Sequence, residues 1–169
     1  MDEPRRRVGA TTGAFLPPHP RQQRRKPSQG VLIHIGQPTI VLVTVCTKDR
    51  LPWLACEEAH SLLVRVWSQA DAWLVGRYTL MPDHLHLFAG PRDLRFPAER
   101  WIAFWKRRFS SAHDHSDWNW QPSSFHHRLR SALDFEEKSN YVRQNPVRAG
   151  LVEESARWPY QGVIHEMRW

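Results

Sequence analysis

The sequence has no long apolar run, few cysteines and no apolar leader. No stretch approaches the roughly 18 uninterrupted apolar residues of a membrane-spanning helix, so no membrane partner is expected. Cys46 and Cys56 are the only cysteines, too few for a disulfide framework or a cysteine-built zinc site. The first residues, MDEPRRRVGA, lack the apolar core of a signal peptide. These absences favour a reduced, cytoplasmic protein.

The positive charge is concentrated at the start of the chain. The 169 residues carry a net charge of +7, and residues 1–30 account for +5 of it, with seven basic and two acidic residues. The same segment contains FLPPHPRQQRRKP, which has little to bury. We therefore predict a flexible basic arm over 1–30 and one folded domain over 31–169. Such an arm either follows a nucleic-acid backbone or only keeps the protein soluble.

Apolar periodicity and turn residues divide the folded region into alternating elements. Ser131 is a typical helix N-cap with Asp134 at the third helical position, and Pro146 is expected to end that helix. The last segment, ARWPYQGVIHE, is expected to pack back on the domain. The patterns predict strands over 39–47, 72–80, 83–89 and 124–129, and helices over 56–70, 97–112 and from Ser131 to Pro146.

This order of elements, β-α-β-β-α-β-α, is typical of an α+β fold. Single helices and hairpins connect the strands in the pattern of a ferredoxin-like fold. We predict a ferredoxin-like antiparallel sheet with helices packed mainly on one face.

Two histidines flank one leucine in the stretch MPDHLHLFAG. Alternate residues of a strand share a face, so His84 and His86 emerge side by side, about 7 Å apart along the chain. Two such imidazoles can converge on one metal ion. They can equally be half-buried structural side chains, and the stretch alone does not decide.

A second candidate pair lies on the last predicted helix. Tyr141 and Asn145 are four residues apart and therefore share a helix face. A tyrosine can serve as a nucleophile, and an amide oxygen is a ligand for hard cations. The residue before a proline is biased away from helical geometry, so Asn145 is expected at a frayed helix end. A packed structural tyrosine is the plain alternative.

These motifs together resemble the HUH single-tyrosine transposases, and more closely the REP-associated tyrosine transposases. The resemblance rests on MPDHLHLF, NYVRQNPVRAGLV and WPY, with further agreement in VTVCTKDR and SFHHRLRS. It covers roughly residues 39–161. The basic arm and the segment HDHSDWNWQPSS have no clear counterpart.

The resemblance implies a metal-dependent single-stranded DNA endonuclease and strand transferase. Tyr141 would attack a phosphate of hairpin (REP-like palindromic) DNA and form a 5′-phosphotyrosine, and His84, His86 and Asn145 would bind the metal. Mg²⁺ or Mn²⁺ suits these ligands, and ligand identity alone does not exclude zinc. The implied partner is single-stranded or hairpin DNA, and the implied assembly is a monomer or a homodimer.

Candidate DNA contacts come from basic residues near aromatic ones. Basic side chains interleaved with aromatic rings suit a single strand, and Trp101 and Trp105 lie beside the densest cluster. The alternative is a solvated helix face whose tryptophans belong to the core. The predicted DNA-binding residues are Lys106, Arg107, Arg108, Arg128, Arg130 and Arg143.

Two other functions remain open on the sequence alone. One is a DNA-binding protein of the same fold that has lost its chemistry. The other is a metal-dependent nuclease that uses water, with Tyr141 in a structural role. Intact His84, His86, Tyr141 and Asn145 argue against the first.

Overall fold

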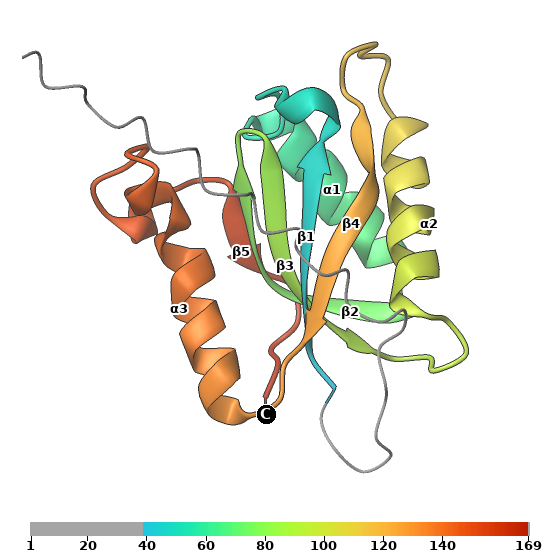
Figure 1. Cartoon of the computed structure of the whole chain (residues 1–169). Coiled ribbons are helices and arrows are strands. Elements are labelled where there is room, and N and C mark those ends of the chain that lie inside the picture. Colours follow the sequence, from blue (N-terminus) through green and yellow to red (C-terminus); the bar gives the residue numbers. More distant parts are fainter. Residues whose placement is uncertain (1–38, 169) are drawn as a thin grey trace, which may run out of the picture.

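We analysed a computed structural model of the chain, which describes residues 39–168 (Figure 1). The predicted basic arm, 1–30, lies outside these residues. The described elements are β1 (Val41–Thr47), η1 (Lys48–Arg50), α1 (Glu57–Gln69), β2 (Trp73–Met81), β3 (His84–Pro91), α2 (Ala98–Ser110), β4 (Trp120–Arg128), α3 (Ala132–Arg148), η2 (Ser155–Arg157) and β5 (Gln161–Val163).

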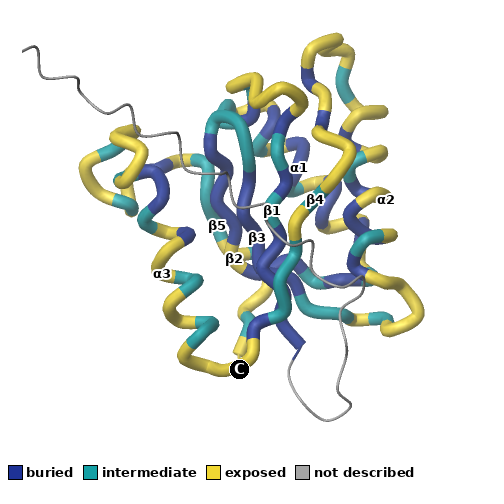
Figure 2. The backbone as a smooth tube through the Cα atoms, in the orientation of Figure 1, coloured by how far each residue is buried: buried dark blue, intermediate teal, exposed yellow. Residues whose placement is uncertain are grey.

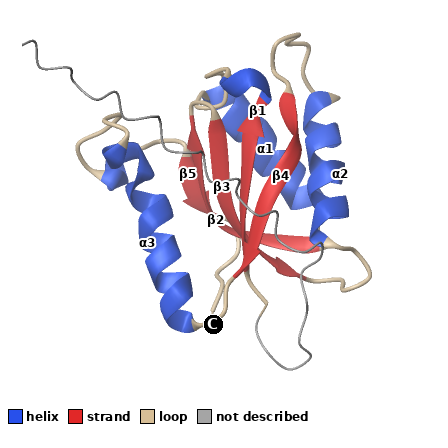
Figure 3. Cartoon of the chain, viewed as in Figure 1, coloured by secondary structure: helices blue, strands red, loops and turns tan. Residues whose placement is uncertain are grey.

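The five strands form one antiparallel sheet in the order β4-β1-β3-β2-β5 (Figure 3). The first four strands follow the predicted β-α-β-β-α-β plan, and the α+β, ferredoxin-like fold class is confirmed. The short strand β5 was predicted only as a segment that packs back. It pairs with β2 through Arg77 and Val163, so the end of the chain extends the sheet.

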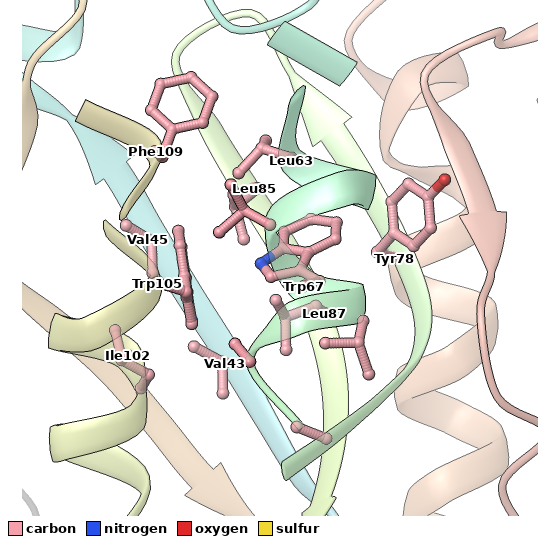
Figure 4. Packing of buried hydrophobic residues seen from close by; sticks show 14 of the residues in the cluster. Val43, Val45, Leu63, Trp67, Tyr78, Leu85, Leu87, Ile102, Trp105 and Phe109 are labelled. Atoms are coloured by element: carbon pink, nitrogen blue, oxygen red, sulfur yellow. The ribbon is translucent and has the colours of Figure 1, made fainter. Parts of the chain in front are cut away.

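The larger core lies between the sheet and the two helices α1 and α2. Inward residues of β1 and β3 alternate along each strand and meet the apolar stripes of both helices (Figure 4). Trp67 of α1 and Trp105 of α2 meet edge to face, with ring centroids 5.9 Å apart. Such aromatic pairs add to the free energy gained by burial. This core holds the sheet in place from one side and leaves its other face for α3.

Helix α3 lies against the opposite face of the sheet, apart from α1 and α2 (Figure 1). It packs there through a smaller cluster of Ile40, Leu42, Phe88, Leu129 and Val142. Two of the three helices therefore share one face, as predicted, and the third covers part of the other. Figure 2 shows exposed and partly buried positions alternating along α3.

The start of α3 agrees with the prediction, and its end does not. The Ser131 hydroxyl accepts a hydrogen bond from the Asp134 amide at 3.1 Å, a typical N-cap. The prediction that Pro146 ends the helix is wrong, because the helix continues to Arg148 with Pro146 inside it. Helical backbone hydrogen bonds continue past the proline, and the Ala149 amide donates to the Asn145 carbonyl at 2.9 Å. Gly150, at φ +69°, then ends the helix.

Candidate active site

The two histidines of β3 emerge together on the α3 face of the sheet. Leu85 and Leu87 point into the larger core, whereas Phe88 belongs to the cluster under α3. Strand alternation therefore places His84 and His86 on the α3 face as well. Their ring centroids are 4.9 Å apart. This separation lets two imidazoles bind one ion, because metal–nitrogen bonds are about 2.0–2.1 Å long.

Each histidine ring is held through its Nδ1 atom. The Asp83 carboxylate lies 2.6 Å from Nδ1 of His84, and the Thr44 hydroxyl lies 2.8 Å from Nδ1 of His86. Within residues 39–168, no hydrogen bond or ion pair engages Nε2 of either ring. Metal-binding histidines are commonly held in this way, with the second ring nitrogen on a carboxylate or other polar group. The rings are thus oriented with Nε2 left for a ligand.

His86 is a neutral imidazole at physiological pH. Burial, and then the positive potential of His84 and Arg50, lower its pKa from 6.5 to about 4. Only the neutral ring offers a lone pair to a metal. The environment that buries His86 therefore favours the form that binds metal.

Arg50 adds a cation to the site from the turn after β1. Its Nε atom lies 2.8 Å from Asp83, the carboxylate that also holds His84. Asp49 and Arg50 both have left-handed backbone conformations, at φ 53° and 59°. Such conformations are uncommon for residues other than glycine and often occur at functional sites. The strained turn and the ion pair together place the guanidinium beside the histidines.

Tyr141 reaches the same site from α3. Its ring centroid lies 6.4 Å from that of His86, and its side chain is 45% exposed. The guanidinium carbon of Arg148, two turns along the helix, lies 5.0 Å from the ring centroid. The phenol is thus accessible to solvent while it lies beside both a histidine and a cation.

Asn145 lies one helical turn beyond Tyr141 and is buried. Helix α3 runs antiparallel to β3, with Phe135 against Phe88 and Tyr141 against His86 (Figure 1). The next turn, about 6 Å further, is therefore expected level with His84. The helix is intact at this position, so the frayed end predicted for Asn145 is wrong.

The donors of this site fit a divalent metal ion of intermediate hardness. Two imidazoles and one amide oxygen suit Mn²⁺ and Mg²⁺ when substrate oxygens complete the coordination. Among the described residues, no group of three or more His, Cys, Asp or Glu side chains is placed to hold a metal. Any third protein ligand here would therefore come from another residue type, and the Asn145 amide is the candidate that the sequence predicts.

The predicted DNA contacts of α2 lie on the other face of the sheet. Lys106 donates through Nζ to the carbonyls of Gln121 and Pro122 on β4, and burial lowers its pKa. Arg107 and Arg108 are exposed on the same helix. The helix is packed with α1 on the face opposite His84 and His86, so the structure does not bring these three cations to the histidines.

The tryptophans beside this cluster are core residues. Trp101 is 2% exposed, and Trp105 is fully buried. Trp101 also donates through Nε1 to the Ala70 carbonyl at 2.6 Å. The prediction that these rings interleave with DNA-binding cations is wrong, and the alternative that they are core is confirmed.

The remaining predicted DNA contacts are dispersed. Arg128 is partly buried at the end of β4, and Arg130 is exposed in the connection to α3. Arg143 is exposed on α3 and donates to the Asn140 side chain at 3.0 Å. Of these, Arg143 shares its helix with Tyr141.

Three residues that orient the site were missed by sequence reasoning: Thr44, Arg50 and Asp83. Asp83 directly precedes His84, so the sequence itself places it near that ring. From the sequence alone, Asp83 was explained only as a turn-forming residue. Thr44 and Arg50 come from β1 and η1, and only strand pairing brings them to the histidines, with Thr44 opposite His86. No local pattern indicates that pairing.

Comparisons with known proteins agree with the resemblance inferred from the motifs. The chain is 28% identical over 93 residues to the REP-associated tyrosine transposase of Escherichia coli strain K12. That match covers 54% of this chain and 52% of the relative, so the chain spans about half the length of the curated relative. No family model matches the chain.

The fold is also similar to a solved structure of a REP-associated tyrosine transposase bound to a REP hairpin. The TM-score is 0.64 at 20% sequence identity, over 73% of this chain and 75% of that one. The sequence comparison therefore confirms the resemblance, and the structural one confirms the fold. Within residues 39–168, no helix is long and apolar enough to cross a membrane.

Proposed function

We propose that this protein is a single-stranded DNA endonuclease and strand transferase of the REP-associated kind. The observation that carries the proposal is the exposed phenol of Tyr141 beside His86, with His84 4.9 Å from His86. A nucleophile beside a pair of oriented imidazoles is the arrangement that metal-assisted phosphoryl transfer requires. The similarity to the Escherichia coli transposase supports the same reading.

In this proposal, Mg²⁺ or Mn²⁺ would be held by Nε2 of His84, Nε2 of His86 and the side-chain oxygen of Asn145. When bound, the ion would neutralise charge on the scissile phosphate and polarise it toward attack. Asp83 and Thr44 would fix the two rings, so that little reorganisation is needed on binding. Burial would keep His86 unprotonated throughout.

The proposed reaction is a transesterification at one backbone phosphate. The Tyr141 oxygen bonds to phosphorus while the bond to the 3′ oxygen breaks, which leaves a 5′-phosphotyrosine and a 3′-hydroxyl. The phenol loses a proton and the departing 3′ oxygen gains one. Because the covalent link conserves the energy of the phosphodiester, the strand can be rejoined to another 3′ end.

In this proposal, two arginines would neutralise the phosphate charge of the bound DNA strand. Arg148 lies against the ring of Tyr141, and Arg50 lies beside Asp83 at the histidines. Guanidinium groups bind phosphate oxygens in a planar, bidentate geometry. We expect the scissile phosphate and its neighbours to lie between these two side chains.

An exposed aromatic ring extends the same row of the sheet. Phe125 on the edge strand β4 pairs with Thr44, which in turn pairs with His86. These cross-strand neighbours share a face, and Phe125 is 51% exposed. A base next to the scissile phosphate would find a stacking surface there.

Hairpin DNA is the proposed substrate. The structurally similar transposase was solved with a REP hairpin, and the described fold has exposed cations on α3 close to Tyr141, among them Arg143. Unpaired nucleotides next to a hairpin leave a phosphate accessible to the phenol, which a continuous duplex does not.

A covalent-trapping assay tests the proposal. Incubation of the full chain with 3′-labelled hairpin DNA and Mn²⁺ should give a labelled protein–DNA adduct that survives denaturation, because the 5′-phosphotyrosine joins the protein to the fragment that carries the 3′ end. Tyr141→Phe should give none. Cleavage that persists in Tyr141→Phe without an adduct would show a nuclease that uses water instead. Hairpin binding without any cleavage would show a DNA-binding protein without chemistry.

A further inference from the structure

A groove of about 810 Å³ lies on the opposite side of the sheet from the candidate active site. It runs between α2, the end of α1 and the loop that follows β3, which Figure 2 shows as largely exposed. Its floor is apolar and rigid, because Ala70 and the buried Trp101 line it and are joined by a hydrogen bond. The groove has the volume of a typical ligand site.

One wall of the groove is the outward face of α2. Arg100, Ala103, Phe104 and Arg107 line it at the spacing i, i+3, i+4, i+7 of a single helix face. Phe104 is 40% exposed at the middle of this face. An accessible aromatic ring thus lies one turn from each of two guanidinium groups.

The facing wall carries a second exposed ring, which pairs with an arginine of α2. Phe96, also 40% exposed, lines it, and the guanidinium carbon of Arg100 lies 5.9 Å from the centroid of its ring. Arginine over an aromatic face is a stabilising pair that leaves the guanidinium edge free for anions. Two exposed rings and their arginines therefore line the same groove.

The groove keeps a net positive charge after the ion pairs of its lining carboxylates are taken into account. Of the lining carboxylates, Asp71 pairs with Arg92 at 3.1 Å, and Asp93 pairs with Arg95 at 2.7 Å. Within residues 39–168, Arg100 and Arg107 form no ion pair with a carboxylate. Both guanidinium groups are therefore available to an anionic ligand.

We propose that this groove binds unpaired nucleotides of single-stranded DNA, at a distance from the scissile phosphate. Bases would stack on Phe96 and Phe104, and Arg100 and Arg107 would contact the phosphates between them. Exposed rings alternating with cations are the recurring chemistry of sequence-tolerant single-strand binding. An acidic peptide would use the arginines but would leave two apolar rings without a function.

The choice of single-stranded DNA as the ligand rests on the proposed function, but this inference concerns binding rather than cleavage. It adds a second contact surface, on the face of the sheet that holds no candidate catalytic residue. A strand engaged there would be anchored to the protein independently of the hairpin. We expect longer single-stranded extensions to bind more tightly for this reason.

The test measures binding of fluorescein-labelled oligothymidine, about 15 nucleotides long, by anisotropy over a range of salt concentrations. The full chain carries Tyr141→Phe throughout, so that no covalent product forms. Phe104→Ala should weaken binding about tenfold, since stacking of one base is worth about 1–3 kcal/mol. Phe104→Trp should restore it.

The arginines are tested by the salt dependence of the same binding. Arg100→Gln and Arg107→Gln should each lower the slope of log K against log salt by about 0.7, the value for one phosphate contact on a single strand. Arg65→Gln on α1 and Leu133→Ala on α3 are matched controls, because both residues are exposed and neither lines the groove. Neither control should change the affinity or the slope.

Unchanged oligothymidine binding in Phe104→Ala and in both arginine variants would overturn the proposal. Tighter binding of poly-glutamate than of oligothymidine, lost in the same variants, would assign the groove to acidic peptides instead. Unchanged thermal unfolding would show that the exposed substitutions leave the fold intact. A wild-type protein that binds through the groove but forms no phosphotyrosine would refute the transferase alone.

Discussion

The ring of Tyr141 lies 6.4 Å from the ring of His86, although the two residues belong to different layers of the fold. Strand β3 presents the histidine, and α3, packed over the same face, presents the tyrosine. The smaller apolar cluster beneath α3, with Phe135 against Phe88, holds these layers together. Packing that has no chemical role therefore sets the geometry of the candidate site.

Removal of one histidine should abolish metal-dependent cleavage and spare binding of the hairpin. His84→Ala removes one imidazole of the pair, and the proposed metal site would keep only two protein ligands, too few to hold a divalent ion well. We expect at least a hundredfold loss of the cleavage rate in Mn²⁺, with hairpin affinity within about twofold of wild type. Gel-based cleavage and mobility-shift assays on the same hairpin measure the two effects.

His165→Ala is the matched control, because His165 is exposed and lies on the terminal segment. It should leave both cleavage and binding unchanged. If His84→Ala cleaved at the wild-type rate in Mn²⁺, the histidine pair would have no role in metal binding.

The carboxylate of Asp83 should control metal affinity without touching the metal. It lies 2.6 Å from Nδ1 of His84 and 2.8 Å from Nε of Arg50. Asp83→Asn removes its charge and loosens the ring, and groups in this position typically contribute 10–100-fold to metal affinity. The expected result is a Mn²⁺ requirement raised by about that factor, with cleavage largely restored at saturating Mn²⁺.

Glu154→Gln, in an exposed ion pair with Arg157, controls for a general change in surface charge. It should leave the Mn²⁺ requirement unchanged. A cleavage rate in Asp83→Asn that no Mn²⁺ concentration restores would contradict a role confined to ring orientation.

Much of the fold was predictable because its signals are local. Helical periodicity located α1 and α2, and the Ser131 cap located the start of α3. Strand alternation likewise predicted that His84 and His86 share a face. Each of these inferences depends on residues within a few positions of one another.

The parts that failed depend on tertiary context. Pro146 was expected to end its helix, but the buried ring and the bonds around it let α3 continue to Arg148. Trp101 and Trp105 were weighed as DNA contacts because a sequence does not show which helix face meets the sheet. Arg50 was missed because its place at the site comes from a turn and an ion pair, neither of which has a periodic signature.

Loss of the cap of α3 should destabilise the protein. The Ser131 hydroxyl accepts a bond from the Asp134 amide, and removal of such a cap costs about 1 kcal/mol. Ser131→Ala should lower the free energy of unfolding by that amount in urea titration. Ser131→Asp should restore it, since aspartate also accepts this bond and favours a helix N-terminus. An unchanged midpoint in Ser131→Ala would show that the cap contributes nothing.

The metal-free protein should lose stability as the pH falls below 6.5. Burial lowers the pKa of His60, whose Nε2 lies 2.8 Å from the Tyr78 hydroxyl. Below pH 6.5 the unfolded chain therefore binds a proton at this position that the folded chain does not. By linkage, the free energy of unfolding falls with decreasing pH until the pH reaches the lowered pKa of the folded state.

His60→Gln isolates this contribution, because glutamine keeps a hydrogen-bonding group and does not titrate. The buried His86 acts in the same direction in wild type and variant alike, so the difference between the two proteins belongs to His60. Urea unfolding in EDTA at pH 7.5 and pH 5 should show a smaller loss of stability in His60→Gln than in wild type. His165→Gln, at an exposed position, should lose as much as wild type does. Equal losses in wild type and His60→Gln would show that protonation of this imidazole costs the folded state nothing.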